Sequence, residues 1–292
     1  MTLTFFKRIS EFSSLVKIAH TVFSLPFAVI GFFLAWQQQG ASFDVKTFLL
    51  MLLCVFFARN AAMSFNRIAD RHIDKKNPRT QHRDLPSGKM NTAYAYFFWA
   101  ANIILFVATT YFLNLLCFLL SPLALLIILG YSYTKRFTWL SHFVLGLGLA
   151  MAPTGAYLAL TAHFHYLPLL YSLAVLCWVS GFDIIYALSD MNFDKQHGLH
   201  SIPERFCLTS SLVISLLLHI VCLMVIIIAG IANHQGIFFW TGAGIFAFLL
   251  FYQHYIVKPN DLSRINFAFF TLNGISGLVL LFFFLLDFFL AT

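Results

Sequence analysis

The sequence predicts an all-α fold, a polytopic membrane bundle of about nine transmembrane helices around a central cavity. Composition, the spacing of apolar runs and the distribution of basic residues predict it. Of 292 residues, 60% are hydrophobic and only 10% are charged, and the mean hydropathy is +0.83. Soluble domains carry about 25% charged residues, so this chain has too few polar side chains to cover a water-exposed surface. A soluble enzyme, a secreted domain and a disordered protein are therefore excluded.

Nine apolar runs are each long enough to cross a bilayer, which takes about 20 residues of helix. The runs are 15–38, 45–65, 91–112, 114–131, 138–162, 167–187, 209–232, 236–257 and 265–290, with a tight turn near Leu113–Asn114. We expect residues 1–14 to form an amphipathic interfacial segment. We also expect residues 1–292 to form a single transmembrane domain.

The basic residues orient these spans. With the N-terminus in the cytoplasm, the inside loops and the N-terminal segment hold every Lys and Arg except Lys46, Arg59 and Lys17, and Lys17 lies at the cytoplasmic end of the first run. Cytoplasmic loops of membrane proteins collect basic residues, so this topology explains the net charge of +7 without nucleic acid. We expect a multi-pass protein of a bacterial inner (plasma) membrane, in contact with the lipid bilayer. The five cysteines form no Cys-x-x-Cys pair and are predicted to be apolar fillers.

Seven of the 11 acidic residues lie in two windows, each beginning at the cytoplasmic end of a span: Asp70, Asp74 and Asp84, then Asp183, Asp190, Asp194 and Glu204. Residues four apart share one helix face, which groups each Asp-x-x-x-Asp pair. Asn66 and then Arg59 extend the first stripe into the membrane, and Tyr186 extends the second. The windows repeat at an offset of 120 residues. Four predicted helices separate them, so both face one compartment.

Paired carboxylates facing one compartment predict a metal site. Carboxylates around an empty space repel one another, whereas Mg²⁺ is bound by one or two carboxylates plus substrate phosphates. Basic residues surround the first window: Arg67, Arg71, Lys75, Lys76, Arg79, Arg83 and Lys89. Arginine binds phosphoryl oxygens in a bidentate manner. These residues predict a magnesium–diphosphate site, and the alternatives are solvated charges at helix ends and positive-inside topology alone.

Four segments resemble the UbiA family of intramembrane aromatic prenyltransferases. NRIADRHIDKKNPRTQHRDLPSG (66–88) and DIIYALSDMNFDKQHGLHSIPERF (183–206) resemble its two signatures. YSYTKRFTWLSHFVLGLGLAMAPTGAYLA (131–159) and KIAHTVFSLPFA (17–28) resemble the segment after the fourth helix and the first helix. The sequences of the second signature and of Tyr131–Thr138 are similar to those of the 4-hydroxybenzoate polyprenyltransferase branch of the family. Many members have Asn-Asp where this chain has Asn66-Arg67, and Arg-Pro-Leu where it has Arg83-Asp84-Leu85.

The resemblance implies transfer of a polyprenyl group from polyprenyl diphosphate to a ring carbon of an aromatic acid, with two Mg²⁺ ions. The expected acceptor is 4-hydroxybenzoate, in ubiquinone or menaquinone biosynthesis, and a naphthoate-type menaquinone precursor is the alternative. The expected catalytic and metal-binding residues are Asp70, Asp74, Asp190 and Asp194. The expected substrate-binding residues are Arg59, Asn66, Arg79, Arg83, Lys135, Asp183 and Tyr186.

Some roles stay open at this level. Arg59 falls on a basic position that faces the acceptor in the family, and Asp183 either contacts the acceptor hydroxyl or holds Arg59. Tyr131, Tyr133 and Tyr186 are candidates to stabilise positive charge through their ring faces. His20, His142 and His219 are predicted to be hydrogen-bonded core residues. A secondary transporter is the main non-enzyme alternative, but it would place its acidic residues nearer to mid-membrane.

Overall fold

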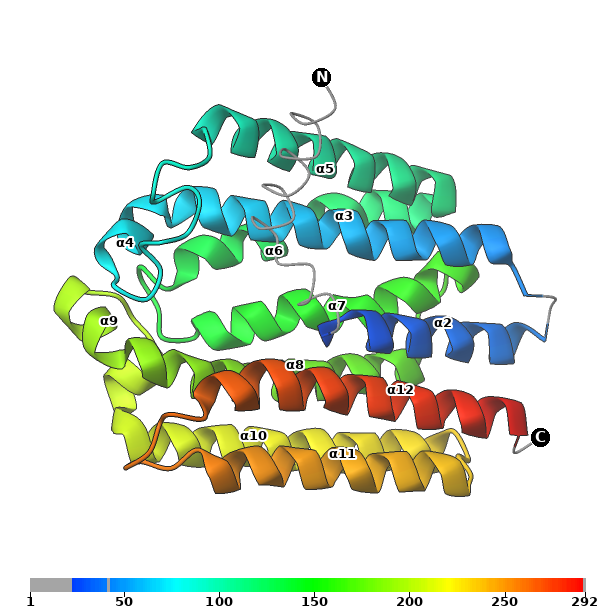
Figure 1. Ribbon diagram of the computed structural model, residues 1–292. Coiled ribbons are helices and arrows are strands. Elements are labelled where there is room, and N and C mark those ends of the chain that lie inside the picture. The colour runs from blue at the N-terminus through cyan, green and yellow to red at the C-terminus, as the bar shows by residue number, and fades with distance from the viewer. Residues whose placement is uncertain (1–22, 41–42, 291–292) are drawn as a thin grey trace.

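The computed structural model describes residues 23–40 and 43–290, and this part of the chain is helical with no β-strand (Figure 1). The helices are α2 (Leu25–Gln39), α3 (Val45–Ala69), α4 (Arg71–Lys76), α5 (Thr92–Leu113), α6 (Leu115–Thr134), α7 (Ser141–Thr161), α8 (Tyr166–Ala187), α9 (Met191–His197), α10 (Ile202–Ala232), α11 (Ile237–Ile256) and α12 (Asn273–Leu290). A 3₁₀ turn (Leu188–Asp190) and a π-helical turn (Phe267–Leu272) interrupt the pattern.

The predicted membrane bundle is confirmed. Within the described residues, eight helical segments are long and apolar enough to cross a membrane. These segments and α2 match the nine predicted runs one to one. The interfacial segment 1–14, the start of the first span and His20 lie outside the described residues. The predicted tight turn between α5 and α6 is present at Asn114, which accepts a hydrogen bond from Cys117 N (2.9 Å) and donates to Leu158 O (2.8 Å).

The short helices α4 and α9 lie at the same end of the bundle (Figure 1). Each follows a spanning helix, α3 or α8, and α5, α6, α7 and α8 come between the two along the chain. Because an even number of spans separates them, both acidic windows face the same side. The structure therefore agrees with the prediction that both windows face one compartment.

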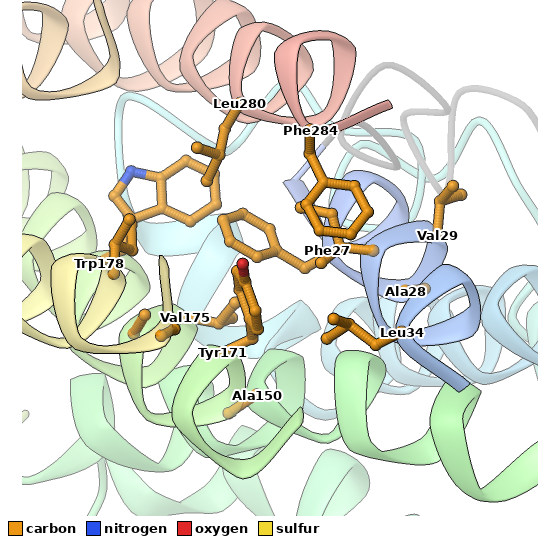
Figure 2. Packing of buried hydrophobic residues seen from close by; sticks show 14 of the residues in the cluster. Phe27, Ala28, Val29, Leu34, Ala150, Tyr171, Val175, Trp178, Leu280 and Phe284 are labelled. Carbon is orange, nitrogen blue, oxygen red and sulfur yellow. The ribbon is translucent and has the colours of Figure 1, made fainter. Parts of the chain in front are cut away.

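The buried apolar core lies on one side of the bundle. It is built mainly by α2, α7, α8 and α12, with fully buried Phe27, Tyr171, Trp178 and Phe284 at its centre (Figure 2). Lipid is as apolar as these side chains, so van der Waals packing holds such helices together. Helix α2 packs closely on α7 at Gly31, where an added Cβ would lie 2.1 Å from the Pro153 carbonyl oxygen. This core leaves the region between α3, α5, α6 and α7 less filled.

Two spanning segments differ in local geometry from the sequence prediction. Helix α10 begins at Ile202, where Ser201 caps it by accepting a hydrogen bond from Glu204 N (3.2 Å), and a kink at Cys207 (φ 64°, ψ 170°) separates this first turn from the span predicted to begin at residue 209. Its first turns carry polar residues, so an apolar-run criterion does not detect them. In the last span, Asn273 Nδ2 donates to the carbonyl oxygens of Ala268 (2.9 Å) and Phe269 (3.3 Å), and the preceding turn is π-helical.

Candidate active site

A cavity of about 720 Å³ runs between α3, α5, α6 and α7 and reaches the end of the bundle where α4 and α9 lie. Along α3 alone its lining extends from Met51 to Arg67, roughly 24 Å at 1.5 Å per helical residue. All predicted site residues line it: Arg59, Asn66, Asp70, Asp74, Arg79, Arg83, Lys135, Asp183, Tyr186, Asp190 and Asp194. The structure therefore brings the two sequence windows together.

The two windows share a local backbone geometry. Helix α3 ends before Asp70, which has φ −93° and ψ 4°, and α9 begins after Asp190, which has φ −107° and ψ −1°. Both residues lie in or near the sparsely populated bridge region, where many active-site residues are found. The second aspartates, Asp74 and Asp194, lie in the short helices α4 and α9. The repeat at an offset of 120 residues is thus also a structural repeat.

Each of the four aspartates is paired with a different basic residue. The pairs are Asp70–Arg136 (3.2 Å), Asp74–Arg83 (2.7 Å), Asp190–Arg79 and Asp194–Lys135 (2.8 Å). We call these eight residues the mouth of the cavity. Opposite charges therefore balance in the mouth when no ligand is present.

The loop after the first window ties it to the second. Asn77 donates a hydrogen bond to Asp190 Oδ1 (3.0 Å), and Arg79 Nε donates to the same oxygen (2.9 Å). Arg79 also donates to the Tyr186 hydroxyl (2.6 Å). Residues 77–79 therefore fix the position of Asp190 from across the cavity.

Asp70 is held from both sides. Asn66 Nδ2 donates to its Oδ2 (3.0 Å), and Arg136 donates both to its Oδ1 and to the Ala69 carbonyl oxygen (2.7 Å). Burial raises the pKa of the Asp70 carboxyl, and the hydrogen bond from Arg136 partly opposes that rise. A bound cation would restore the charged form.

Asp194 is the most deeply buried of the four carboxylates, with its side chain fully inaccessible. Lys135 Nζ lies 2.8 Å from its Oδ1, but within the described chain neither oxygen accepts a hydrogen bond of good geometry. No three His, Cys, Asp or Glu residues among those described surround a common point. This donor set fits Mg²⁺, which takes one or two carboxylates and completes its shell with water and phosphate oxygens.

Asp183 faces the cavity one turn before Tyr186, and its partner is His142. His142 Nδ1 lies 2.7 Å from Asp183 Oδ2, and Ile202 N donates to Nε2 of the same ring (3.3 Å). Because Nε2 is the acceptor, Nδ1 carries the proton and donates it to Asp183. Both His142 and His219 are buried and hydrogen-bonded, as predicted.

Aromatic rings line the cavity beside the mouth. Tyr186 stacks on Phe269 (centroids 4.1 Å apart), and Phe182 and Phe23 pack edge-on against the same ring (5.2 and 5.6 Å). All four line the cavity, as does Tyr131. Tyr133 is exposed and lies under Arg136, so of the three candidate tyrosines it is the one outside the cavity lining.

Several residues that form the site carry no distinctive signal in the sequence. Asn77 and Arg136 contact mouth carboxylates, and their signal was only proximity to the two motifs. Phe23, Phe182 and Phe269 could not be distinguished among 36 phenylalanines. Arg67, which the sequence grouped with six other basic residues without a role of its own, lines the cavity and is 7% exposed.

Comparison with known proteins identifies the family. The model of the UbiA prenyltransferase family matches residues 24–275. The chain belongs to this family. It is therefore an integral-membrane prenyltransferase, as the sequence predicted, and not a transporter. A 4-hydroxybenzoate octaprenyltransferase of Vesicomyosocius okutanii is 30% identical over 79% of this chain and 86% of its own. One of Aliivibrio fischeri is 29% identical over 81% and 82%.

Solved structures agree with the fold of this prenyltransferase. A UbiA homologue from Aeropyrum pernix is 33% identical with a TM-score of 0.83, covering 92% of this chain and 98% of its own. A UbiA homologue from Archaeoglobus fulgidus, solved bound to DMAPP and Mg²⁺, has a TM-score of 0.68 at 19% identity and covers 92% and 99%. Both cover nearly the whole described bundle.

Proposed function

We propose that this prenyltransferase moves a polyprenyl group from polyprenyl diphosphate to a ring carbon of 4-hydroxybenzoate, in the inner membrane of a bacterium. The observation that carries the proposal is a mouth of four aspartates and four basic residues on an otherwise apolar cavity. A polyprenyl diphosphate has the same two parts, a charged head and an apolar tail. The names of the curated relatives support the acceptor.

When the donor binds, basic residues of the mouth exchange their aspartate partners for phosphoryl oxygens. Without ligand, Arg79, Arg83 and Lys135 neutralise aspartates. With the donor bound, these cations turn to the phosphoryl oxygens, for which the planar guanidinium is well suited. The tail lies along the apolar lining, which includes Val55, Leu120, Ile127, Leu145 and Leu149.

The aspartates that lose their basic partners when the donor binds are suitable ligands for Mg²⁺. Asp70, Asp74, Asp190 and Asp194 would hold two ions together with the diphosphate, which requires no more than two protein carboxylates for each ion. Bound Mg²⁺ supplies electrostatic stabilisation of the negative charge on the leaving diphosphate. The A. fulgidus homologue solved with DMAPP and Mg²⁺ supports this assignment.

The reaction separates charge inside the cavity. The allylic carbon–oxygen bond breaks and its electron pair leaves with the diphosphate, where Arg79 and Arg83 stabilise the negative charge. The ring faces of Tyr186 and Phe269 stabilise the positive charge on the allylic carbon, while the apolar lining excludes water that would capture it. The acceptor ring carbon attacks the allylic carbon and then loses its proton.

Two residues orient the acceptor. Arg59 lies on the cavity-lining face of α3 two turns from Asn66, a position suited to the carboxylate of a small aromatic acid. Asp183 accepts a hydrogen bond from the acceptor hydroxyl, and His142 holds Asp183 in place. A hydroxyl next to the attacked carbon makes that carbon electron-rich, and its hydrogen bond to Asp183 increases the effect.

The test is product formation by the purified chain in lipid with polyprenyl diphosphate and Mg²⁺. We expect a prenylated product, identified by mass spectrometry, with 4-hydroxybenzoate. Product with a naphthoate-type acid but not with 4-hydroxybenzoate would replace the acceptor assignment. No product with any aromatic acid would contradict the proposed reaction.

A further inference from the structure

Arg67 is a buried cation on the cavity-lining face of α3. Its side chain is 7% exposed and lies among the residues that line the cavity. It belongs to the same helical stripe as Met63 and Asp70, which also line the cavity. Unlike the four basic residues of the mouth, Arg67 makes no hydrogen bond or ion pair with a residue in the described part of the chain.

An unpaired guanidinium at this depth is costly. A buried charge without a partner destabilises a protein, and an ionisable group within a membrane span is expensive unless it has a function. The four mouth aspartates cannot neutralise Arg67, because each already pairs with another base. Arg67 therefore adds a positive charge to the cavity lining that the ion pairs of the mouth do not balance, and an anionic ligand would balance it.

The position of Arg67 indicates which anion it binds. Its electrostatic neighbours are Arg83, Asp74 and Asp70 of the mouth and Tyr186, which accepts a hydrogen bond from Arg79 of the mouth. Arg59, placed here at the acceptor carboxylate, lies eight residues earlier on α3, about 12 Å away along the helix axis. A ligand group that reaches Arg67 therefore lies beside the phosphate-binding residues and not beside Arg59.

We propose that Arg67 is a further substrate-binding residue that donates hydrogen bonds to phosphoryl oxygens of the prenyl diphosphate. This proposal rests on the proposed function and extends its donor site by one arginine. Arg79, Arg83 and Lys135 must each leave an aspartate before they bind phosphate, whereas Arg67 has no carboxylate to leave. Arg67 is therefore ready to bind the diphosphate first, before the ion pairs of the mouth exchange partners.

The experiment measures binding of inorganic pyrophosphate with Mg²⁺ to the purified protein in lipid nanodiscs, by titration calorimetry. The variants are Arg67→Gln and Arg67→Lys. Arg71→Gln is the matched control, because Arg71 lies one turn further along, donates to the Ile68 carbonyl oxygen and is not among the cavity-lining residues. Apparent KM values for donor and acceptor are measured on the same preparations.

We expect Arg67→Gln to raise the pyrophosphate Kd and the donor KM about 10- to 100-fold, the range for a lost charge-assisted hydrogen bond. Arg67→Lys should recover part of this affinity, because it keeps the charge and loses the planar fork. Arg71→Gln should bind like the wild type. Should Arg67→Gln fail to fold, weaker pyrophosphate binding by Arg67→Lys is the expected result.

Wild-type pyrophosphate affinity in a folded Arg67 variant would overturn the inference. A rise in the acceptor KM alone would also overturn it and would assign Arg67 to the acceptor carboxylate. The outcome is separable from that of the proposed function. Pyrophosphate binding that depends on Arg67 supports the inference even if no aromatic acid is prenylated, and prenylation with unchanged pyrophosphate binding contradicts only the inference.

Discussion

At the scale of single residues, each basic side chain of the mouth forms an ion pair with a carboxylate of the mouth in the ligand-free structure. The Arg79–Asp190 and Arg83–Asp74 pairs hold guanidinium groups at the position proposed here for the diphosphate. Breaking a buried pair by removing one partner leaves an uncompensated charge. We therefore expect variants of these residues to affect both the folded ligand-free protein and donor binding.

Arg59 separates acceptor recognition from donor recognition. We expect Arg59→Ala to raise the acceptor KM about 10- to 100-fold, as for a lost charge-assisted pair, and to leave the donor KM nearly unchanged. Arg59→Lys should restore part of the loss. The measurement is the two apparent KM values in reconstituted membranes. Impairment of the donor side alone would instead place Arg59 in the diphosphate site.

His142 acts as a positioning residue for Asp183. Replacement by Phe removes the 2.7 Å hydrogen bond to Asp183 and leaves that carboxylate without its donor. We expect His142→Phe to lower kcat about tenfold or more, with a smaller change in the donor KM. In His142→Asn the side-chain amide can donate from the position of Nδ1, so this variant should recover part of kcat. Equal loss in both variants would argue for a role in packing only.

The sequence predicted the charged residues of the site because paired aspartates at matched spacing are rare in an apolar chain. It did not predict which base binds which carboxylate, since that depends on how the loop at residues 77–83 folds back toward α8. It also placed Arg67 among seven basic residues near the first window without distinguishing it from the others. Only the structure shows that Arg67 lines the cavity while its neighbours Arg71 and Lys75 do not.

At the scale of helices, apolar runs predicted every described span, because length and hydropathy determine which segments can cross a membrane. Boundaries were less predictable where polar residues belong to a helix. Helix α10 includes Glu204 and Arg205, and α3 continues to Ala69, four residues beyond the apolar run. The π-helical turn at Phe267–Leu272 depends on hydrogen bonds from Asn273, which no periodicity reveals.

Gly31 sets how closely α2 packs on α7. An Ala at this position would place its Cβ 2.1 Å from the Pro153 carbonyl oxygen, so the two helices must separate. We expect Gly31→Ala to destabilise the bundle by about 1–3 kcal/mol, as other overpacked cores are destabilised.

The measurement for Gly31 is thermal unfolding in detergent. Gly130→Ala is the control, because nothing lies within 4 Å of an added Cβ at that helical position. The control should unfold at or slightly above the wild-type temperature. Equal unfolding temperatures for the two variants would contradict the close contact between α2 and α7.

At the scale of the whole molecule, the packed core and the cavity occupy different parts of the bundle. The packed cluster on α2, α8 and α12 provides rigidity, and the space among α3, α5, α6 and α7 accommodates an extended apolar tail. Both acidic windows open at one end of this arrangement (Figure 1). The enzyme can therefore take a water-facing diphosphate and a membrane-embedded tail at the same time.

The topology predicts which side of the membrane this end faces. Lys76 in α4 and Gln196 in α9 are both exposed, so cysteines introduced there are accessible. In a background with the exposed Cys207 replaced by Ser, we expect Lys76→Cys and Gln196→Cys to react with a membrane-impermeant maleimide only from the cytoplasmic side. Labelling of either from outside would overturn the orientation, and opposite sides for the two would overturn the even number of spans between them.

The central claim is that two windows 120 residues apart form one magnesium–diphosphate site. The most direct measurement is Mg²⁺-dependent binding of a prenyl diphosphate to the wild type, to Asp70→Asn and to Asp190→Asn, each in lipid. We predict that the wild type binds only with Mg²⁺ and that either substitution alone removes this binding while the protein remains folded. Wild-type affinity in either folded variant, or tight binding by the wild type without divalent metal, would contradict the claim.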